Sequence, residues 1–171
     1  YYVMKVLPDL YDESNDLLQS LLTRLAKVEE KAVNNYITIM ANRHKQTLST
    51  AWTNEKITNM KQVNGASVSD YFKFENDSIV IKKRCWGMLL GKTSVYSPAN
   101  EFHLKILKNG EVSDNTYITH DRAEWITVSL FNGSMFEPGD VLSLVYSSGT
   151  TGEYEFGTPT KLMLILLDKE V

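Results

Sequence analysis

The C-terminal stretch Lys161-Leu-Met-Leu-Ile-Leu-Leu-Asp168 decides the fold of this chain. Its centre, Leu162 to Leu167, holds six consecutive apolar residues. Such a run is too short to span a membrane, and it is too uniformly apolar for a strand with one face in water. We therefore expect a β-strand whose two faces are both covered.

Two layers are needed to cover that strand. A parallel sheet would take helices on both faces, but from Val68 onward the sequence shows short alternating runs and no helical period. A β-sandwich covers one face with its second sheet. We expect two further copies of the chain to cover the other face, so that a homotrimer forms with Leu162, Leu164 and Leu166 at its interface.

Composition narrows the class of protein. The 171 residues have room for one β domain and one appended element, and a net charge of −3 gives no reason to expect nucleic acid as a partner. The single cysteine, Cys85, cannot form an intrachain disulfide, so stability must come from packing or oligomerisation. No stretch is typical of a transmembrane helix, and membrane insertion is not expected.

Apolar residues recur at alternating spacings of three and four near the N-terminus. This heptad pattern predicts a helical coiled-coil stalk, because one helix with so narrow an apolar stripe is marginal in water. The alternative is that the stripe packs on the chain's own β domain. The a positions are Leu18, Leu25, Ala32 and Ile39, the d positions are Leu21, Val28, Asn35 and Asn42, and all but Asn42 are assigned to the trimer interface.

The stripe weakens after Met40, and Asn64-Gly65 is typical of a break in the chain. We therefore expect two parts: a helical stalk with its junction at residues 1–63 and a β head at residues 64–171. From Ser69 the head reads as about eight short strands separated by turns such as Asn109-Gly110, which indicates a sandwich or jelly roll.

Several segments of the head carry a family resemblance. They read I-V-I at 79–81, W-G-M-L-L at 86–90, F-H-L-K-I-L-K-N-G at 102–110, and W-I-T-V-S-L-F followed by F-E-P-G-D-V-L-S-L-V between 125 and 145. Together with the apolar last strand, this order resembles the tumour-necrosis-factor and C1q-like jelly rolls. The resemblance implies a trimer in which the last strand lies centrally in the inner sheet, facing a threefold axis.

A compact trimeric head on a helical stalk also resembles the distal parts of bacteriophage tail fibres, baseplate receptor-binding proteins and head fibres. The resemblance implies a virion protein of the tail, baseplate or capsid surface, docked to other virion proteins by its stalk and attached by its head to a bacterial surface saccharide or wall polymer. Two alternatives stay open: a structural assembly or decoration module of a phage particle, and a secreted or cell-surface C1q/TNF-like binding protein.

No motif predicts catalysis, a cofactor or a metal site. The three histidines, His44, His103 and His120, show no ligand spacing, and the aspartates of the loops form no contiguous calcium-binding loop. The Gly-Thr-Thr-Gly stretch at 149–152 lacks both a nucleophile elbow and a P-loop lysine. We therefore expect a protein that is not an enzyme.

Loops are the expected ligand-binding elements of such a head. The segment from Ser147 to Pro159 carries aromatic residues among small polar ones, a mixture that can stack on a sugar or a flat protein surface. The alternative is a plain hairpin whose aromatic side chains cap the sandwich. The candidate ligand-binding residues are Tyr154, Phe156, Tyr96 and Tyr117.

Overall fold

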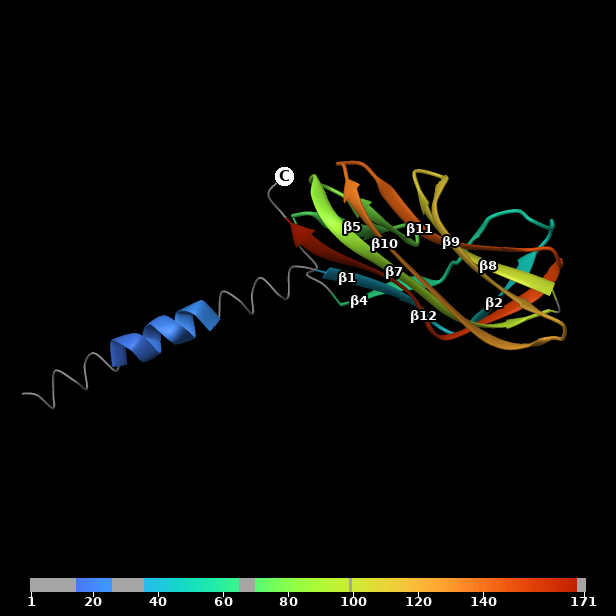
Figure 1. Cartoon of the computed structure of the whole chain (residues 1–171), viewed down its shortest axis with the longest axis horizontal. Helices are drawn as coiled ribbons and strands as arrows, with labels where there is room; N and C mark the ends of the chain where they lie inside the picture. Colours follow the sequence, from blue (N-terminus) through green and yellow to red (C-terminus); the bar gives the residue numbers. More distant parts are fainter. Residues whose placement is uncertain (1–14, 26–35, 65–69, 99, 169–171) are drawn as a thin grey trace, which may run out of the picture. The chain divides into compact units, whose positions relative to one another are not determined.

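The computed structural model describes residues 15–25, 36–64, 70–98 and 100–168. The chain divides into two compact units, Tyr1–Asn34 and Asn35–Val171. The described part of the first unit is a helix at 15–25, and the second unit is a β-sandwich (Figure 1). The boundary expected between residues 63 and 64 is therefore wrong, because strands begin at Tyr36.

The helix at 15–25 exposes its leucines. Each is between 50% and 62% accessible to solvent, although leucine favours burial. The expected core positions Leu18, Leu21 and Leu25 are thus free to meet a partner, while Val28, Ala32 and Asn35 lie outside the described residues. A coiled coil remains a prediction for this segment. The exposed leucines are Leu17, Leu18, Leu21, Leu22 and Leu25.

The heptad pattern does not describe the chain beyond residue 35. Ile39 belongs to β1 (Tyr36–Ala41) and is fully buried, and Asn42 lies exposed between β1 and β2 (His44–Leu48). The β-branched run Ile37-Thr38-Ile39 prefers an extended backbone, in which alternate side chains enter one core. The position of Ile39 one heptad after Ala32 is therefore coincidental, and its assignment to a stalk interface is wrong.

Within the described residues the sandwich consists of two antiparallel sheets (Figure 1). Sheet A has the order β10-β7-β12-β1-β4, with β2 also paired to β12. Sheet B has the order β5-β6-β11-β8-β9, with β3 also paired to β11. Besides β1 and β2, the strands are β3 (Glu55–Lys56), β4 (Met60–Asn64), β5 (Phe72–Glu75), β6 (Ser78–Ile81), β7 (Cys85–Ser97), β8 (Asn100–Lys108), β9 (Glu111–His120), β10 (Glu124–Phe136), β11 (Val141–Ser148) and β12 (Gly152–Asp168).

The last strand lies centrally in sheet A, as the family resemblance implies. Leu162 of β12 is opposite Gly91 of β7 on one side and Ile39 of β1 on the other. Gly91 is needed there, because a Cβ at this position would come within 2.8 Å of Leu144 in sheet B. The two sheets thus approach closely where the predicted strand and the glycine of β7 meet.

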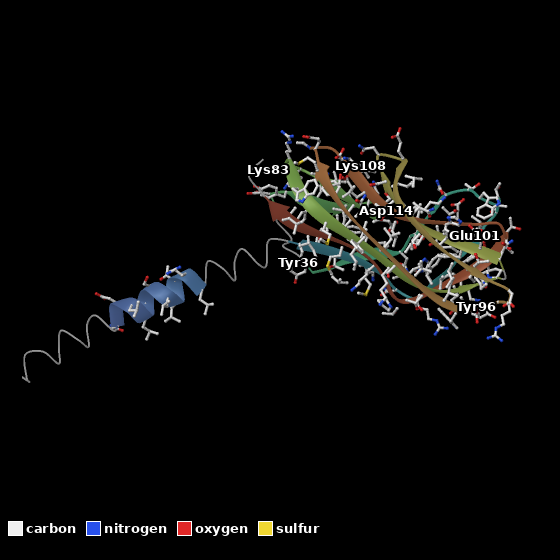
Figure 2. The ribbon with its side chains drawn as sticks, viewed as in Figure 1. Tyr36, Lys83, Tyr96, Glu101, Lys108 and Asp114 are labelled. Carbon is white, nitrogen blue, oxygen red and sulfur yellow. The ribbon has the colours of Figure 1, made fainter. Side chains whose placement is uncertain are left out.

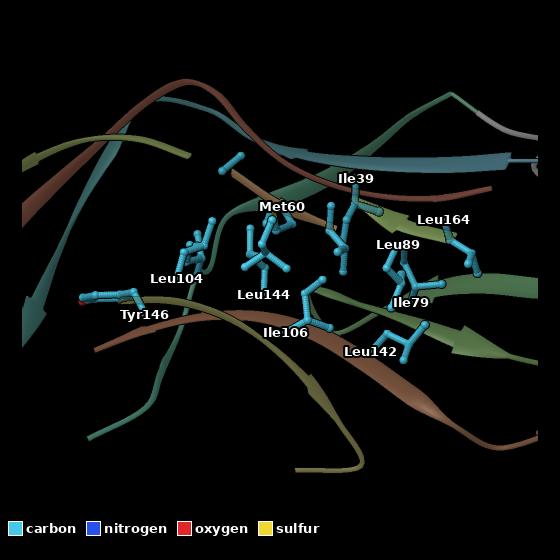
Figure 3. Close-up of a cluster of buried hydrophobic side chains, with 14 of the residues drawn as sticks. Ile39, Met60, Ile79, Leu89, Leu104, Ile106, Leu142, Leu144, Tyr146 and Leu164 are labelled. Carbon is cyan, nitrogen blue, oxygen red and sulfur yellow. The ribbon is translucent and has the colours of Figure 1, made fainter. Parts of the chain in front are cut away.

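Alternate residues of β7, β8, β10 and β12 fill the space between the sheets (Figure 3). This period of two is what a half-buried strand requires. The aromatic part of the core joins Phe102 and Tyr146 of sheet B to Tyr154 and Phe156 of sheet A, with ring centroids 4.9 to 6.0 Å apart. The aliphatic part includes Ile39, Ile79, Leu89, Leu104, Ile106, Leu142, Leu144 and Leu164.

Two turns at one end of the sandwich are tied together by Asp140. Asn109 and Gly110 have positive φ angles of 55° and 85° and close the β8–β9 hairpin, which confirms the turn predicted from the sequence. The carboxylate of Asp140 accepts hydrogen bonds from the amide of Asn109 and from the backbone N–H of Glu137, both at 2.8 Å. Lys108 lies 3.3 Å from the same carboxylate.

Candidate interaction surfaces

The face of sheet A that is turned away from sheet B carries large apolar side chains. On β12, Met163 and Ile165 are partly exposed and Leu167 is 55% exposed. The strand register places Leu90 of β7 beside Met163 and Met88 beside Ile165. An apolar stripe therefore crosses the central strands of the sheet on its outer side.

Phe131 of β10 continues the stripe from Leu90, and 71% of its surface is accessible to solvent. We call the whole surface the apolar band. Within the described residues the strands form two layers, and none of them lies over this band (Figure 1). A contiguous apolar patch on a folded protein is typical of an interaction site. The apolar band consists of Tyr36, Trp86, Met88, Leu90, Phe131, Met163, Ile165 and Leu167.

The sequence prediction selected the wrong side of β12 for this surface. Leu162, Leu164 and Leu166 are at most 5% exposed and point into the sandwich, so they cannot form an interface between chains. Both alternating sets of β12 are apolar, and the sequence of this strand alone therefore does not say which set faces the second sheet. The neighbouring strand gives the signal, because Gly87 and Gly91 mark the inner side of β7 and leave Trp86, Met88 and Leu90 outside.

Tyr154 and Phe156 are also core residues. Both have no solvent-accessible surface, and the hydroxyl of Tyr154 donates a hydrogen bond of 2.6 Å to the carbonyl of Thr150. Burial raises the pKa of Tyr154 against the opposing effect of its hydrogen bonds. The expectation that these two residues contact a ligand is wrong, because β12 already begins at Gly152 and directs them inward.

Tyr96 lies at the other end of the outer face of sheet A from the apolar band. Figure 2 shows it at the opposite end of the sandwich from Tyr36. Its ring meets Trp125 of β10 edge to face at 5.9 Å, and the guanidinium of Arg43 lies 5.5 Å from the centroid of Trp125. Arg43 is in turn held by Glu155 at 2.5 Å. Tyr96 therefore belongs to a small cluster of exposed aromatic and charged side chains.

Tyr117 lies on the outer face of sheet B, where the strand register pairs it with His103 of β8. The two rings are stacked, with centroids 5.1 Å apart and an interplanar angle of 19°. The ring of Trp52 also meets His103, edge to face, with centroids 5.5 Å apart and an interplanar angle of 85°. Neither Trp52 nor His103 was a candidate from sequence, because only the fold brings residues 52, 103 and 117 together.

The three histidines lie in separate places and form no cluster. His44 contacts Asn42, Gln46 and Phe156, His103 lies in the aromatic cluster of sheet B, and His120 contacts the carbonyl of Arg122. Across the described ranges no group of three or more metal-ligating side chains lies together. No helix in those ranges has both the length and the apolar character that crossing a membrane requires.

No family model and no curated protein matches the chain. Solved structures do match its architecture. Murine APRIL superposes with a TM-score of 0.59 at 9% identity, covering 78% of this chain and 98% of that one. The globular domain of zebrafish complement 1qA gives 0.59 at 14% identity, with 80% and 100% covered. The fold is a TNF/C1q-like jelly roll.

Eiger TNF from S. frugiperda superposes on the same jelly roll, with a TM-score of 0.56 at 6% identity over 80% of this chain and 94% of that one. The jelly-roll fold implied by the sequence resemblance is therefore confirmed, and the trimer that the resemblance also implies stays a prediction. Identities this low establish the jelly roll and not a function. Function has to be argued from the surfaces that this chain presents.

Proposed function

We propose that the chain is a non-enzymatic attachment protein of a bacteriophage particle. Its jelly-roll head assembles as a homotrimer through the apolar band, and its N-terminal helices associate as a coiled coil that docks to other virion proteins. The head attaches to a saccharide or wall polymer of the bacterial surface. Three heads on one stalk would turn weak single contacts into firm attachment.

The observation that carries this proposal is the apolar band, which runs from Phe131 on the edge strand β10 across β7 and β12 to Tyr36 on β1. A tumour-necrosis-factor-like jelly roll that exposes such a band is explained most simply if a second and a third copy cover it. The exposed leucines of the helix at 15–25 support the same conclusion, because a short helix gains stability by burying its apolar stripe against partners.

Solution mass tests the assembly. Light scattering should give three times the chain mass of 19.5 kDa. Phe131→Asp should dissociate the heads by placing a charge in the band, whereas Val112→Asp, at an exposed apolar residue of sheet B, should leave the mass unchanged. A monomer at working concentration would remove the basis of the proposal.

A secreted or cell-surface C1q/TNF-like binding protein is the second candidate. The likeness to murine APRIL and to zebrafish complement 1qA supports it as well as it supports a virion protein. Mass spectrometry of purified particles and of the particle-free medium separates the two. The chain should be found in the particles under the first proposal and in the medium under the second.

A further inference from the structure

Three aromatic rings make continuous contact on the outer face of sheet B: Trp52, His103 and Tyr117. Trp52 is 54% exposed and Tyr117 is 61% exposed, so the two aromatic residues that contact the imidazole are both accessible to a ligand. We call this group the aromatic platform. It lies on the opposite side of the sandwich from the apolar band and stays accessible when that band is covered.

Hydrogen bonds fix the imidazole at the centre of the platform. One ring nitrogen of His103 pairs with the carboxylate of Glu101, and the other lies 3.1 Å from the side-chain oxygen of Asn115. Only 15% of the His103 side chain is accessible. The two hydrogen bonds hold the central ring in one orientation, which gives the outer rings a defined surface to pack on and lowers the entropy lost when a ligand binds.

The backbone of Trp52 adopts an unfavourable conformation. Its φ of 64° lies in the left-handed region, which a bulky residue rarely adopts. The strand end β11 holds it there: its N–H donates a 2.8 Å hydrogen bond to the carbonyl of Ser148, and its ring covers Gly149, where a Cβ would approach it to 2.8 Å. Strain of this kind at an exposed aromatic residue indicates a function for the side chain.

Polar groups surround the exposed rings. The side chain of Glu101, labelled in Figure 2, is one-third exposed, and its carboxylate lies beside the imidazole. Asn115 is exposed two residues before Tyr117, and the two side chains lie on the same face of β9. Lys105 donates a 2.7 Å hydrogen bond to the side chain of Asn54, two residues after Trp52. Hydrogen-bond donors and acceptors therefore border the exposed aromatic rings.

We propose that the aromatic platform binds a pyranose ring of a saccharide. A pyranose has an apolar C–H face that stacks on aromatic rings and a rim of hydroxyl groups that pair with carboxylates and amides. The stacked arrangement of His103 on Tyr117 makes a layered surface rather than a cage of rings turned inward around a cation. This site deepens the proposed attachment function by assigning the saccharide contact to sheet B.

Saturation-transfer NMR on the full chain tests the site with five probes: glucose, galactose, mannose, rhamnose and N-acetylglucosamine. At least one sugar should receive saturation, and its affinity should fall about tenfold or more in Trp52→Ala and in Tyr117→Ala. Val112→Ala shortens an exposed apolar side chain elsewhere on β9 and should bind as the wild type does. Tyr117→Phe keeps the ring and should retain binding.

A comparison of two substitutions separates binding from folding. Trp52→Gly suits the left-handed backbone better than Trp52→Ala, so it should unfold at the higher temperature of the two. Both should lose the sugar signal equally if the indole is a ligand contact. A signal retained in either folded variant would overturn the assignment.

Two other results would also overturn it. Absence of saturation transfer to all five sugars would exclude the pyranose site, and binding of choline chloride in their place would show that the platform recognises a cation. Neither result would bear on the trimer, which is measured by solution mass, or on the presence of the chain in particles. If the chain is a trimer in particles but binds none of the sugars, only the saccharide site is wrong and the proposed function stands.

Discussion

Lys92 of β7 lies directly opposite Lys161 of β12 on the outer face of sheet A. Both side chains are partly buried, and no ion pair joins either of them to an acidic residue in the described ranges. Like charges that face each other across two strands repel. The apolar band is therefore bordered by a pair of lysines that weakens the very sheet carrying it.

Replacing one of these lysines by an acid should strengthen the sheet. Lys161→Glu converts the repulsive pair into an attractive one and should raise the free energy of unfolding by roughly 0.2–1 kcal/mol at low salt. Urea unfolding at one fixed protein concentration measures the change, which should shrink as salt is added. Lys61→Glu, on the same face but opposite Met40, is the matched control and should have a smaller effect. A loss of stability in Lys161→Glu would show that its positive charge has a favourable partner.

The two faces of β12 should respond differently to truncation. Leu164 is fully buried between the sheets, so Leu164→Ala should cost about 2–5 kcal/mol of unfolding free energy. Ile165, its neighbour, belongs to the apolar band, and Ile165→Ala should change the stability of a single head far less. Its main effect should appear as weaker association in light scattering at low concentration. Equal losses of unfolding free energy, measured under dissociating conditions, would contradict this division of the strand.

Much of the sandwich could be predicted because its signals are local. The alternation in β7, the hairpin turn at Asn109-Gly110 and the apolar run of β12 each depend on residues close in sequence. Residues 36–64 were mispredicted because Ile39 happened to continue a heptad spacing. The heptad spacing alone does not tell whether Ile39 belongs to a helix or to a strand. The β-branched residues around it favour the strand.

The surfaces were harder to predict than the strands. Leu164 and Ile165 are both apolar, so only the register with β7 shows which of them faces outward. Tyr154 and Phe156 resembled loop residues because β12 extends further toward the N-terminus than its apolar run suggests. The contact of Trp52 with His103 joins residues 51 positions apart, and such a contact follows from topology rather than from local pattern.

Acid should weaken the end of the sandwich where Asp140 ties two turns together. Burial alone would raise the pKa of its carboxyl, but the hydrogen bonds from Glu137, Asn109 and Lys108 outweigh burial and hold the pKa below its ordinary value of 3.8. Since the folded pKa is the lower one, the stability that this group contributes is present above the unfolded pKa. It is lost as the pH falls through the folded pKa.

Asp140→Asn tests this linkage. The variant should lose about 1–3 kcal/mol of unfolding free energy at pH 7, because the backbone N–H of Glu137 loses a charged acceptor in a buried turn. Its stability should also fall less steeply than that of the wild type below about pH 4. Denaturant unfolding from pH 7 to pH 3 measures both effects. Parallel pH profiles for the two proteins would show that Asp140 does not titrate with folding.

Cys85 should be inert in the folded chain. It has no accessible surface, and burial, followed by the nearby carboxylates of Asp140 and Glu137, raises the pKa of its thiol to about 11. At pH 8 roughly one thiol in a thousand would be ionised, and the thiolate is the form that reacts. Iodoacetamide should therefore label Cys85 only as the protein unfolds in urea, with a midpoint that matches loss of structure. Val112→Cys, which adds an exposed thiol on β9, supplies the reference rate for an accessible cysteine. Labelling of native Cys85 at that reference rate would mean that the first residues of β7 open far more readily than the burial of Cys85 implies.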